Sequence, residues 1–154
     1  MPLRDLLSSD AVFPSLKVTN KKQVIQELSA KAAHLTGHDE REIFETLLRR
    51  ERLGSTGVGG GVAIPHGKLP KLDRIIGLFA RTDSPVDFES LDGEPVDLIF
   101  LLLAPEAAGA DHLKALARIA RLLRDPEVAG KLRAARDADA VYALLTVPPA
   151  SNAA

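Results

Sequence analysis

The sequence predicts an α/β fold, a three-layer-like sandwich in which helices flank a mixed β-sheet within a single domain. Two observations support this fold class. The run VDLIFLLLA, residues 96–104, is apolar on both faces, as a central strand covered by helices should be. The apolar runs 74–81 and 96–104 have no crossover helix between them. The sheet is therefore expected to be mixed and not a strict βαβ repeat.

Two helices are expected before the strands. Residues 20–36 carry apolar side chains at helical spacing, with Asn20 as the N-cap and Gly37 as the stop. Asp39 is expected to cap a second helix, which ends at Gly54. The buried face of this second helix is predicted to consist of four apolar residues, Ile43, Phe44, Leu47 and Leu48.

The apolar period then changes to that of strands. GVAIP, residues 61–65, predicts a short strand, and RIIGLFAR, residues 74–81, predicts a longer one ahead of the central run. The segment between the two longer strands is expected to be a loop with an edge strand near 86–88.

The remainder of the domain is predicted to be helical. Asp111 is expected to open one helix, and Asp125 followed by Pro126 opens the next. Either Asp137 or Asp139 starts the last helix. The inward face of the first of these helices is predicted to carry Leu113, Leu116, Ala120 and Leu123.

Composition and charge limit the possible classes of protein. A formal charge of −1 gives no bulk field favouring nucleic acid or an anionic membrane. The absence of cysteine excludes disulfides, thiolate catalysis and cysteine-based zinc sites. The start MPLRDLLSSDAVF lacks the apolar core of a signal peptide, and the longest apolar run, 98–105, is too short to cross a bilayer. We therefore expect a soluble cytoplasmic protein without membrane insertion.

The most distinctive stretch is GVGGGVAIPHGK, residues 57–68. Its glycines do not form a P-loop, because no Gly-Lys-Ser/Thr follows, nor a dinucleotide fingerprint, because the order is helix, loop, strand. The glycines alone are equally compatible with a flexible helix-to-strand connection. His66 differs from them, because Pro65 fixes the backbone before it and Gly67 allows close approach after it. We expect His66 to be presented at the end of the 61–65 strand.

A second histidine strengthens the case for a site. His112 follows Asp111 at a predicted helix N-terminus, directly after the central strand. Strand ends and helix N-termini are where α/β folds build ligand sites, and the backbone N–H groups there suit an anion. The other two histidines, His34 and His38, are interpreted as exposed surface residues.

Three segments of the sequence resemble one known family. They are LLRRERLGSTGVGGGVAIPHGK (47–68), SPVDFESLDGEPVDLIFLLLAP (84–105) and DHLKALARIARLLRD (111–125). They are similar to the enzyme IIA domains of the phosphoenolpyruvate-dependent sugar phosphotransferase system, in the fructose/mannitol branch that includes the nitrogen-related regulator. The resemblance implies a type-2 IIA domain over residues 1–147, and 148–154 are expected to be a disordered tail.

The resemblance implies that His66 accepts a phosphoryl group from the phosphohistidine of HPr or of its nitrogen-branch analogue. Neutral imidazole is a good nucleophile near pH 7, since its unperturbed pKa is about 6.5. Transfer between two imidazoles is nearly isoenergetic and needs mainly in-line positioning and charge stabilisation. The scheme requires no metal and no cofactor.

The family's remaining site residues map onto this chain one by one. His112 corresponds to the second active-site histidine, which would hydrogen-bond the phosphoryl group or orient the first. Arg50 matches the arginine of the Arg-Glu pair and would contact phosphoryl oxygens. Ser55 and Thr56 would donate hydroxyl hydrogen bonds or shape the turn, and Gly67 would let the partner approach. The loop GVGGG departs from the family by being richer in glycine.

The resemblance leaves several functions open. The first is a phosphorylation-dependent regulator of partners such as potassium transporters or sensor kinases. The second is a sugar-specific component that passes the phosphoryl group to a separate IIB, and the third is a phosphorylation-independent binding module. A metal-dependent hydrolase is the least supported, because further carboxylate ligands have no clear candidates. The small size favours the free-standing nitrogen type, and a homodimer is left open.

Overall fold

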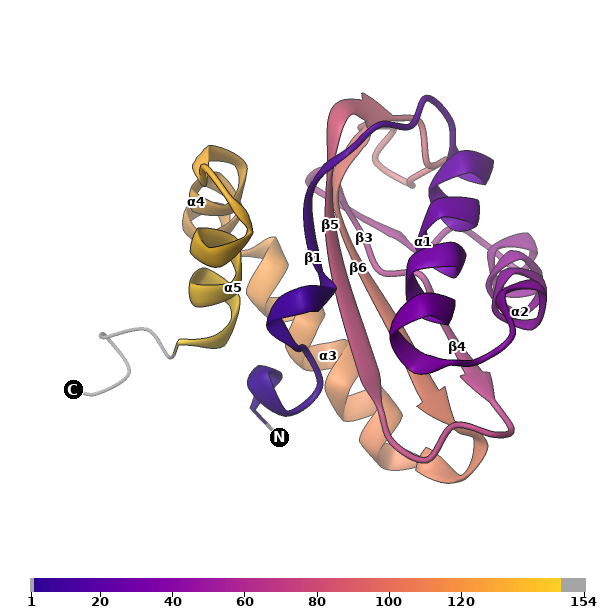
Figure 1. The fold of residues 1–154 in the computed structure, drawn as a ribbon. Coiled ribbons are helices and arrows are strands. Elements are labelled where there is room, and N and C mark those ends of the chain that lie inside the picture. The colour runs from indigo at the N-terminus through magenta and orange to yellow at the C-terminus, as the bar shows by residue number, and fades with distance from the viewer. Residues whose placement is uncertain (1, 148–154) are drawn as a thin grey trace.

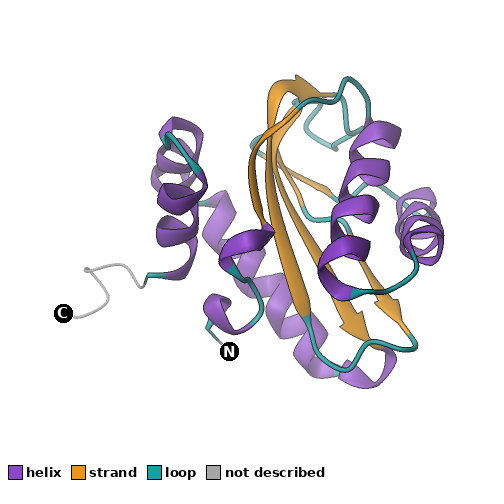
Figure 2. Ribbon diagram, in the orientation of Figure 1, coloured by secondary structure: helices purple, strands orange, loops and turns teal. Residues whose placement is uncertain are grey.

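The computed structural model describes residues 2–147, which form a six-stranded mixed sheet between layers of helices (Figures 1 and 2). The α-helices are α1 (Lys21–Thr36), α2 (Glu40–Arg52), α3 (Ala110–Arg124), α4 (Pro126–Ala134) and α5 (Ala138–Thr146). The strands are β1 (Val12–Leu16), β2 (Gly57–Gly59), β3 (Val62–Ala63), β4 (His66–Leu69), β5 (Ile76–Val86) and β6 (Val96–Pro105). The predicted tail, 148–154, lies outside the described residues.

The sheet has the order β1-β5-β6-β3-β2. β4 also pairs with β6, but nearer the carboxyl end of β6 than β3 does. β5 and β6 are antiparallel, whereas β1 is parallel to β5 and both β3 and β4 are parallel to β6. The mixed sheet and the central place of β6 are thus confirmed. β1, β2 and β4 add strands that the sequence did not predict.

The predicted edge strand near 86–88 does not exist as a separate element. β5 continues past the predicted end at 81 as far as Val86, which pairs with Val96 at the start of β6. The difference arises because β5 pairs with β6 over this extra length. The connecting loop is therefore limited to residues 87–95.

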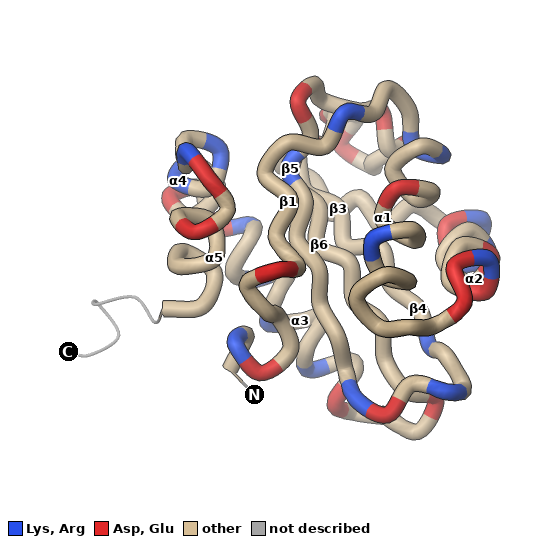
Figure 3. The backbone as a smooth tube through the Cα atoms, viewed as in Figure 1, with Lys and Arg blue, Asp and Glu red and all other residues tan. Residues whose placement is uncertain are grey.

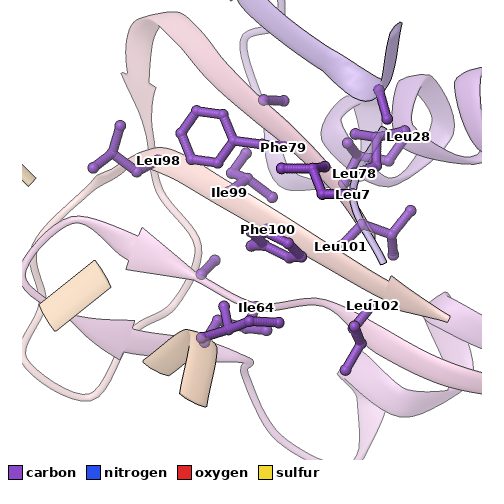
Figure 4. Packing of buried hydrophobic residues seen from close by; sticks show 14 of the residues in the cluster. Leu7, Leu28, Ile64, Leu78, Phe79, Leu98, Ile99, Phe100, Leu101 and Leu102 are labelled. Atoms are coloured by element: carbon purple, nitrogen blue, oxygen red, sulfur yellow. The ribbon is translucent and has the colours of Figure 1, made fainter. Parts of the chain in front are cut away.

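The three layers predicted from the sequence are present. Figure 1 shows α1 and α2 on one face of the sheet, and α3, α4 and α5 on the other. Residues 98–103 of β6 are at most 1% exposed, so side chains on both faces of this strand are buried. Figure 4 shows Leu98, Phe100 and Leu102 in this core, with Phe79 of β5 beside the strand. The core therefore surrounds β6 and fixes where its carboxyl end lies.

The predicted helix caps are confirmed at most helices. The side chains of Asn20 and Asp39 accept backbone N–H groups in the first turns of α1 and α2. Asp125 caps α4, and Asp137 rather than Asp139 caps α5.

Helix α3 differs from the prediction at its start and in its buried face. Gly109 is its N-cap, so Asp111 already lies in the first turn. The buried residues are His112, Ala115, Ile119 and Leu123, whereas Leu113 is 68% exposed. One residue along a helix turns the side chain by about 100°, so this change of face brings His112 inward.

The glycine-rich run forms a hairpin between β2 and β3. Gly59, Gly60 and Gly61 all have positive φ, a conformation that favours glycine at each position. The N–H of Gly60 donates to Asp92 at 2.9 Å, and Arg133 donates to the Gly60 carbonyl at 2.8 Å. The glycines therefore build an ordered turn, and not the flexible connection that their composition also allowed.

This turn lies away from His66. Val62, next to the turn, pairs with Leu98, whereas His66 pairs with Leu102. Four residues along a strand span about 13 Å. The glycine richness thus serves the hairpin at the amino end of β6, and His66 stands towards the carboxyl end.

Charges of both signs are interspersed on α2 and α4 (Figure 3). This mixture agrees with the net charge of −1, and neither of these two helices presents a surface of a single charge sign. None of the helices within residues 2–147 is long and apolar enough to cross a membrane.

Candidate phosphoryl site

The two predicted site histidines line the same pocket, an open hollow of about 300 Å³. Three elements surround it: the last turns of α2, the start of β4 and the first turn of α3. The lining residues are Thr46, Arg49, Arg50, Leu53, His66, Gly67, Lys68 and His112.

The topology explains why histidines far apart in the sequence meet. β4 runs parallel to β6 with His66 opposite Leu102, so His66 lies near the carboxyl end of β6. The chain leaves β6 at Pro105 and enters α3 at Ala110, which places His112 at the same end of the sheet. The two imidazole centroids are 5.6 Å apart and the rings are inclined by 55°.

His66 does not end the 61–65 strand as predicted, but is the first residue of β4. The interruption falls at Pro65, which has no N–H to donate, although its carbonyl accepts the Leu102 N–H at 3.0 Å. His66 Nδ1 lies 2.8 Å from the carbonyl oxygen of Ile64. Because a carbonyl can only accept, Nδ1 carries the proton, and Nε2 of the neutral ring carries the lone pair.

Burial keeps both imidazoles neutral. Desolvation is the largest cause that lowers the pKa of His66, and the charge of Arg50 lowers it further. The Ile64 carbonyl and the Glu51 carboxylate act in the opposite direction on the pKa of His66. Burial also lowers the pKa of His112, with contributions from the neighbouring His66 and Lys68. Two neutral histidines therefore face each other near pH 7.

Cations surround the histidines. Arg49, Arg50 and Lys68 line the pocket, and no carboxylate is among its lining residues in the described part of the chain. Nη1 of Arg50 donates to the Gly54 carbonyl at 2.8 Å, which holds its guanidinium near the end of α2. The pocket thus suits an anionic group. Within residues 2–147, no group of three or more His, Cys, Asp or Glu is arranged to hold a metal ion.

The structure does not bring the hydroxyls of Ser55 and Thr56 into this pocket. Ser55 Oγ donates to the Phe88 carbonyl at 2.5 Å and accepts the Gly57 N–H at 3.0 Å. Thr56 is 4% exposed, and its hydroxyl donates to the carboxylate of Glu51. Both side chains bind neighbouring protein groups and shape the connection after α2.

Gly67 has a packing role inside the domain. A Cβ at this position would lie 2.7 Å from Cγ2 of Thr46, well inside ordinary contact. Glycine therefore lets β4 approach α2 closely and brings His66 beside the arginines of that helix.

Sequence reasoning missed Glu51 and Lys68. Glu51 is a buried carboxylate, 7% exposed, but only its neighbour Arg50 in the Arg-Glu pair was predicted to belong to the site. The helical period carried a usable signal, since Glu51 follows the buried Leu47 by four residues and so shares its face. Lys68 lies two residues after His66 in β4, and strand alternation places both side chains on one face.

Comparisons with known proteins identify the family of this chain. The family described as "Phosphoenolpyruvate-dependent sugar phosphotransferase system, EIIA 2" matches residues 5–147. A nitrogen regulatory protein of Bradyrhizobium diazoefficiens is 69% identical over 153 residues, covering 99% of this chain and all of the relative. A nitrogen regulatory protein of Pseudomonas aeruginosa is 45% identical over 144 residues, covering 93% of this chain and 94% of the relative.

Solved structures share the fold. The nitrogen regulatory protein IIA-Ntr from Neisseria meningitidis has a TM-score of 0.89 and 36% identity, over 94% of this chain and 99% of that one. The mannitol IIA of Escherichia coli, at 22% identity, has a TM-score of 0.76 over 90% of this chain and 97% of that chain. The chain belongs to the type-2 IIA family of the phosphoenolpyruvate-dependent sugar phosphotransferase system.

Proposed function

We propose that this protein is a phosphoryl carrier that accepts a phosphoryl group on Nε2 of His66. The donor is the phosphohistidine of HPr or of its nitrogen-branch analogue. One observation carries the proposal: the Nδ1–H of His66 is bound to the Ile64 carbonyl, which leaves the lone pair on Nε2. Membership of the IIA family supports the same chemistry.

The transfer forms one bond and breaks one. Nε2 of His66 attacks the phosphorus while the bond from phosphorus to the donor imidazole breaks, and the donor nitrogen keeps that electron pair. No proton needs to move, because the proton on Nδ1 of His66 stays there throughout, and a donor ring that is protonated on its other nitrogen leaves as neutral imidazole. The Ile64 carbonyl, 2.8 Å away, then stabilises the positive charge that develops on the phosphorylated ring.

Several neighbouring side chains stabilise the phosphoryl oxygens, each through a different interaction. Arg50 and Lys68 supply positive charge at the pocket rim. His112 remains neutral, and because its Nδ1 is buried, Nε2 is the ring nitrogen left to donate to a phosphoryl oxygen. The first turn of α3, which carries His112, adds the favourable end of its helix dipole.

A regulatory output is the best-supported role for the phosphorylated state. The relatives that are 69% and 45% identical are both named nitrogen regulatory proteins, and the former aligns along its whole length. We therefore propose that the phosphorylation state of His66 controls the binding of regulated partner proteins, of the kind represented by potassium transporters and sensor kinases.

Intact-mass analysis tests the carrier role. The wild-type protein is incubated with phosphoenolpyruvate, enzyme I and HPr or its nitrogen-branch analogue, beside the variants His66→Ala and His34→Ala. His34 is the matched control, because it is an exposed histidine on α1. We expect one acid-labile phosphoryl adduct on the wild type and on His34→Ala, and none on His66→Ala. An adduct that persists in His66→Ala would contradict the site, and no adduct from either donor would favour a phosphorylation-independent binding module.

Transfer onward separates regulation from sugar transport. The phosphorylated protein is mixed with IIB proteins of the fructose and mannitol type, and loss of its adduct is followed by mass. A regulator should keep the adduct, whereas rapid transfer to a IIB would favour the sugar-specific role.

A further inference from the structure

Glu51 is a charged residue in the interior beside the site. Its side chain is 3% exposed, at the end of α2. The carboxylate accepts the N–H of Thr56 at 3.1 Å and the hydroxyl of the same residue. Nζ of Lys21, at the start of α1, lies 2.9 Å from Oε1 of Glu51. Three donors thus hold a carboxylate that would otherwise be costly to bury.

The hydrogen bonds continue from this carboxylate to the imidazole of His66. The carbonyl of Thr56 accepts the Ile64 N–H at 3.0 Å. The carbonyl of Ile64 in turn accepts the Nδ1–H of His66 at 2.8 Å. Every residue between the carboxylate and the ring is buried, since Thr56 is 4% and Ile64 is 3% exposed. Three hydrogen bonds, joined through the backbone of Thr56 and Ile64, therefore link the Glu51 carboxylate to the His66 ring.

Side chains are needed to hold the backbone in place between α2 and β4. Residues 54–56 have no regular secondary structure, and Ile64 and Pro65 lie between two short strands. Pro65 has no N–H to donate, so fewer backbone hydrogen bonds hold this stretch than would hold a continuous strand. The three bonds to the Glu51 carboxylate tie the connection after α2 to the ends of two helices.

A neighbouring ion pair and an aromatic contact support Lys21 in turn. Its Nζ is 4.9 Å from the ring centroid of Phe88 and 3.6 Å from Oε1 of Glu89. Its side chain is 18% exposed. Phe88 and Glu89 thus help to keep the ammonium of Lys21 beside the Glu51 carboxylate, whose charge it offsets.

We propose that Lys21, Glu51 and Thr56, here called the Glu51 network, are positioning residues that lock His66 in the Nδ1–H tautomer and aim its Nε2 at the incoming phosphoryl group. The proposal rests on the proposed function, to which it adds residues that touch neither the phosphoryl group nor the donor. It also gives Thr56 a role different from direct phosphoryl contact.

Two substitutions each remove part of the network without removing bulk. Glu51→Gln replaces one carboxylate oxygen by an amide NH₂, which cannot accept from Thr56 or Lys21. Thr56→Val keeps the shape of the side chain but deletes its hydroxyl, and Thr56→Ser restores that hydroxyl. Glu45→Gln is the matched control, because Glu45 is an exposed glutamate of the same helix paired with Arg41.

The first readout is the tautomer of His66 in the unphosphorylated protein. ¹⁵N spectra of histidine-labelled protein, recorded above the pH range in which imidazole titrates, distinguish Nδ1–H from Nε2–H. We expect a single Nδ1–H form in the wild type, Glu45→Gln and Thr56→Ser, and a mixture of tautomers in Glu51→Gln and Thr56→Val. The second readout is the rate of phosphoryl acceptance, which should fall about tenfold or more in the latter two, since small misplacements of reacting groups cost up to about 10²-fold.

The outcomes separate this inference from the proposed function. Wild-type tautomer populations and rates in both Glu51→Gln and Thr56→Val would overturn the positioning role while leaving the carrier role intact. A wild type that accepts no phosphoryl group would overturn the carrier role, whereas the tautomer spectra would still decide whether the network holds the ring. If Glu51→Gln does not fold, Thr56→Val and its rescue by Thr56→Ser decide the matter.

Discussion

Replacing Gly67 by alanine should destabilise the protein through a single contact. The added Cβ would meet Cγ2 of Thr46 at 2.7 Å, which is 0.7 Å short of the 3.4 Å at which such contacts become ordinary. Gly67 lies in β4, whose pairing with β6 resists movement, and Thr46 lies within α2, where a β-branched side chain has few alternative rotamers. Overpacking of this kind costs about 1–3 kcal/mol, so we expect the free energy of unfolding to fall by about 2 kcal/mol.

A second substitution tests that the loss arises from this one contact. Thr46→Ser removes Cγ2 and leaves the hydroxyl, so the double variant Gly67→Ala with Thr46→Ser should recover at least about half of the loss. Urea denaturation followed by circular dichroism measures all four proteins of the cycle. Strictly additive effects of the two substitutions, or a stable Gly67→Ala protein, would refute the packing explanation of Gly67.

Three further predictions concern pH and packing. Because burial lowers the pKa of His66 and His112 below 6.5, the unfolded chain binds more protons just below pH 6.5. Stability should therefore fall as the pH drops through the window from 6.5 to the folded-state pKa values, and the double variant His66→Gln with His112→Gln should flatten this slope in urea titrations. The acid limb of the rate of phosphoryl acceptance should lie below pH 6.5, and a midpoint above that value in rapid-quench kinetics would contradict the cause assigned to the shift. Arg81→Met should lower the free energy of unfolding by about 2–4 kcal/mol, because Arg81 donates to carbonyls of Pro14 in β1 and Leu132 in α4. An unchanged midpoint in urea denaturation would contradict this structural role of Arg81.

Strong local signals made much of the fold predictable. Asn20 and Asp39 are side chains whose capping bonds depend only on neighbours in the sequence, and both caps formed. Apart from Asp97, the run 96–104 is apolar, which is typical of a strand covered on both faces, and it became β6. The motif around His66 indicates a candidate site at a strand end from the sequence alone.

The missed features depend on contacts between distant residues. β1 includes Pro14 and shows no clear alternation, and its strand conformation comes from pairing with β5. Leu123 is buried in α3 as predicted, but the rest of the buried face lies one residue earlier than predicted, because Leu113 is a stronger apolar signal than the buried His112. Ser55 and Thr56 carry hydroxyls that suit a phosphoryl group, but their partners, Phe88 and Glu51, are identified only by the fold.

The central claim is that Nε2 of His66 is the phosphoryl acceptor. The most direct measurement is a ¹⁵N spectrum of histidine-labelled protein before and after phosphorylation, with the ³¹P–¹⁵N coupling used to identify the bonded nitrogen. The account predicts coupling at Nε2 of His66, while Nδ1 of that ring keeps its proton on the Ile64 carbonyl. Coupling at Nδ1 of His66, or at either nitrogen of His112, would contradict it.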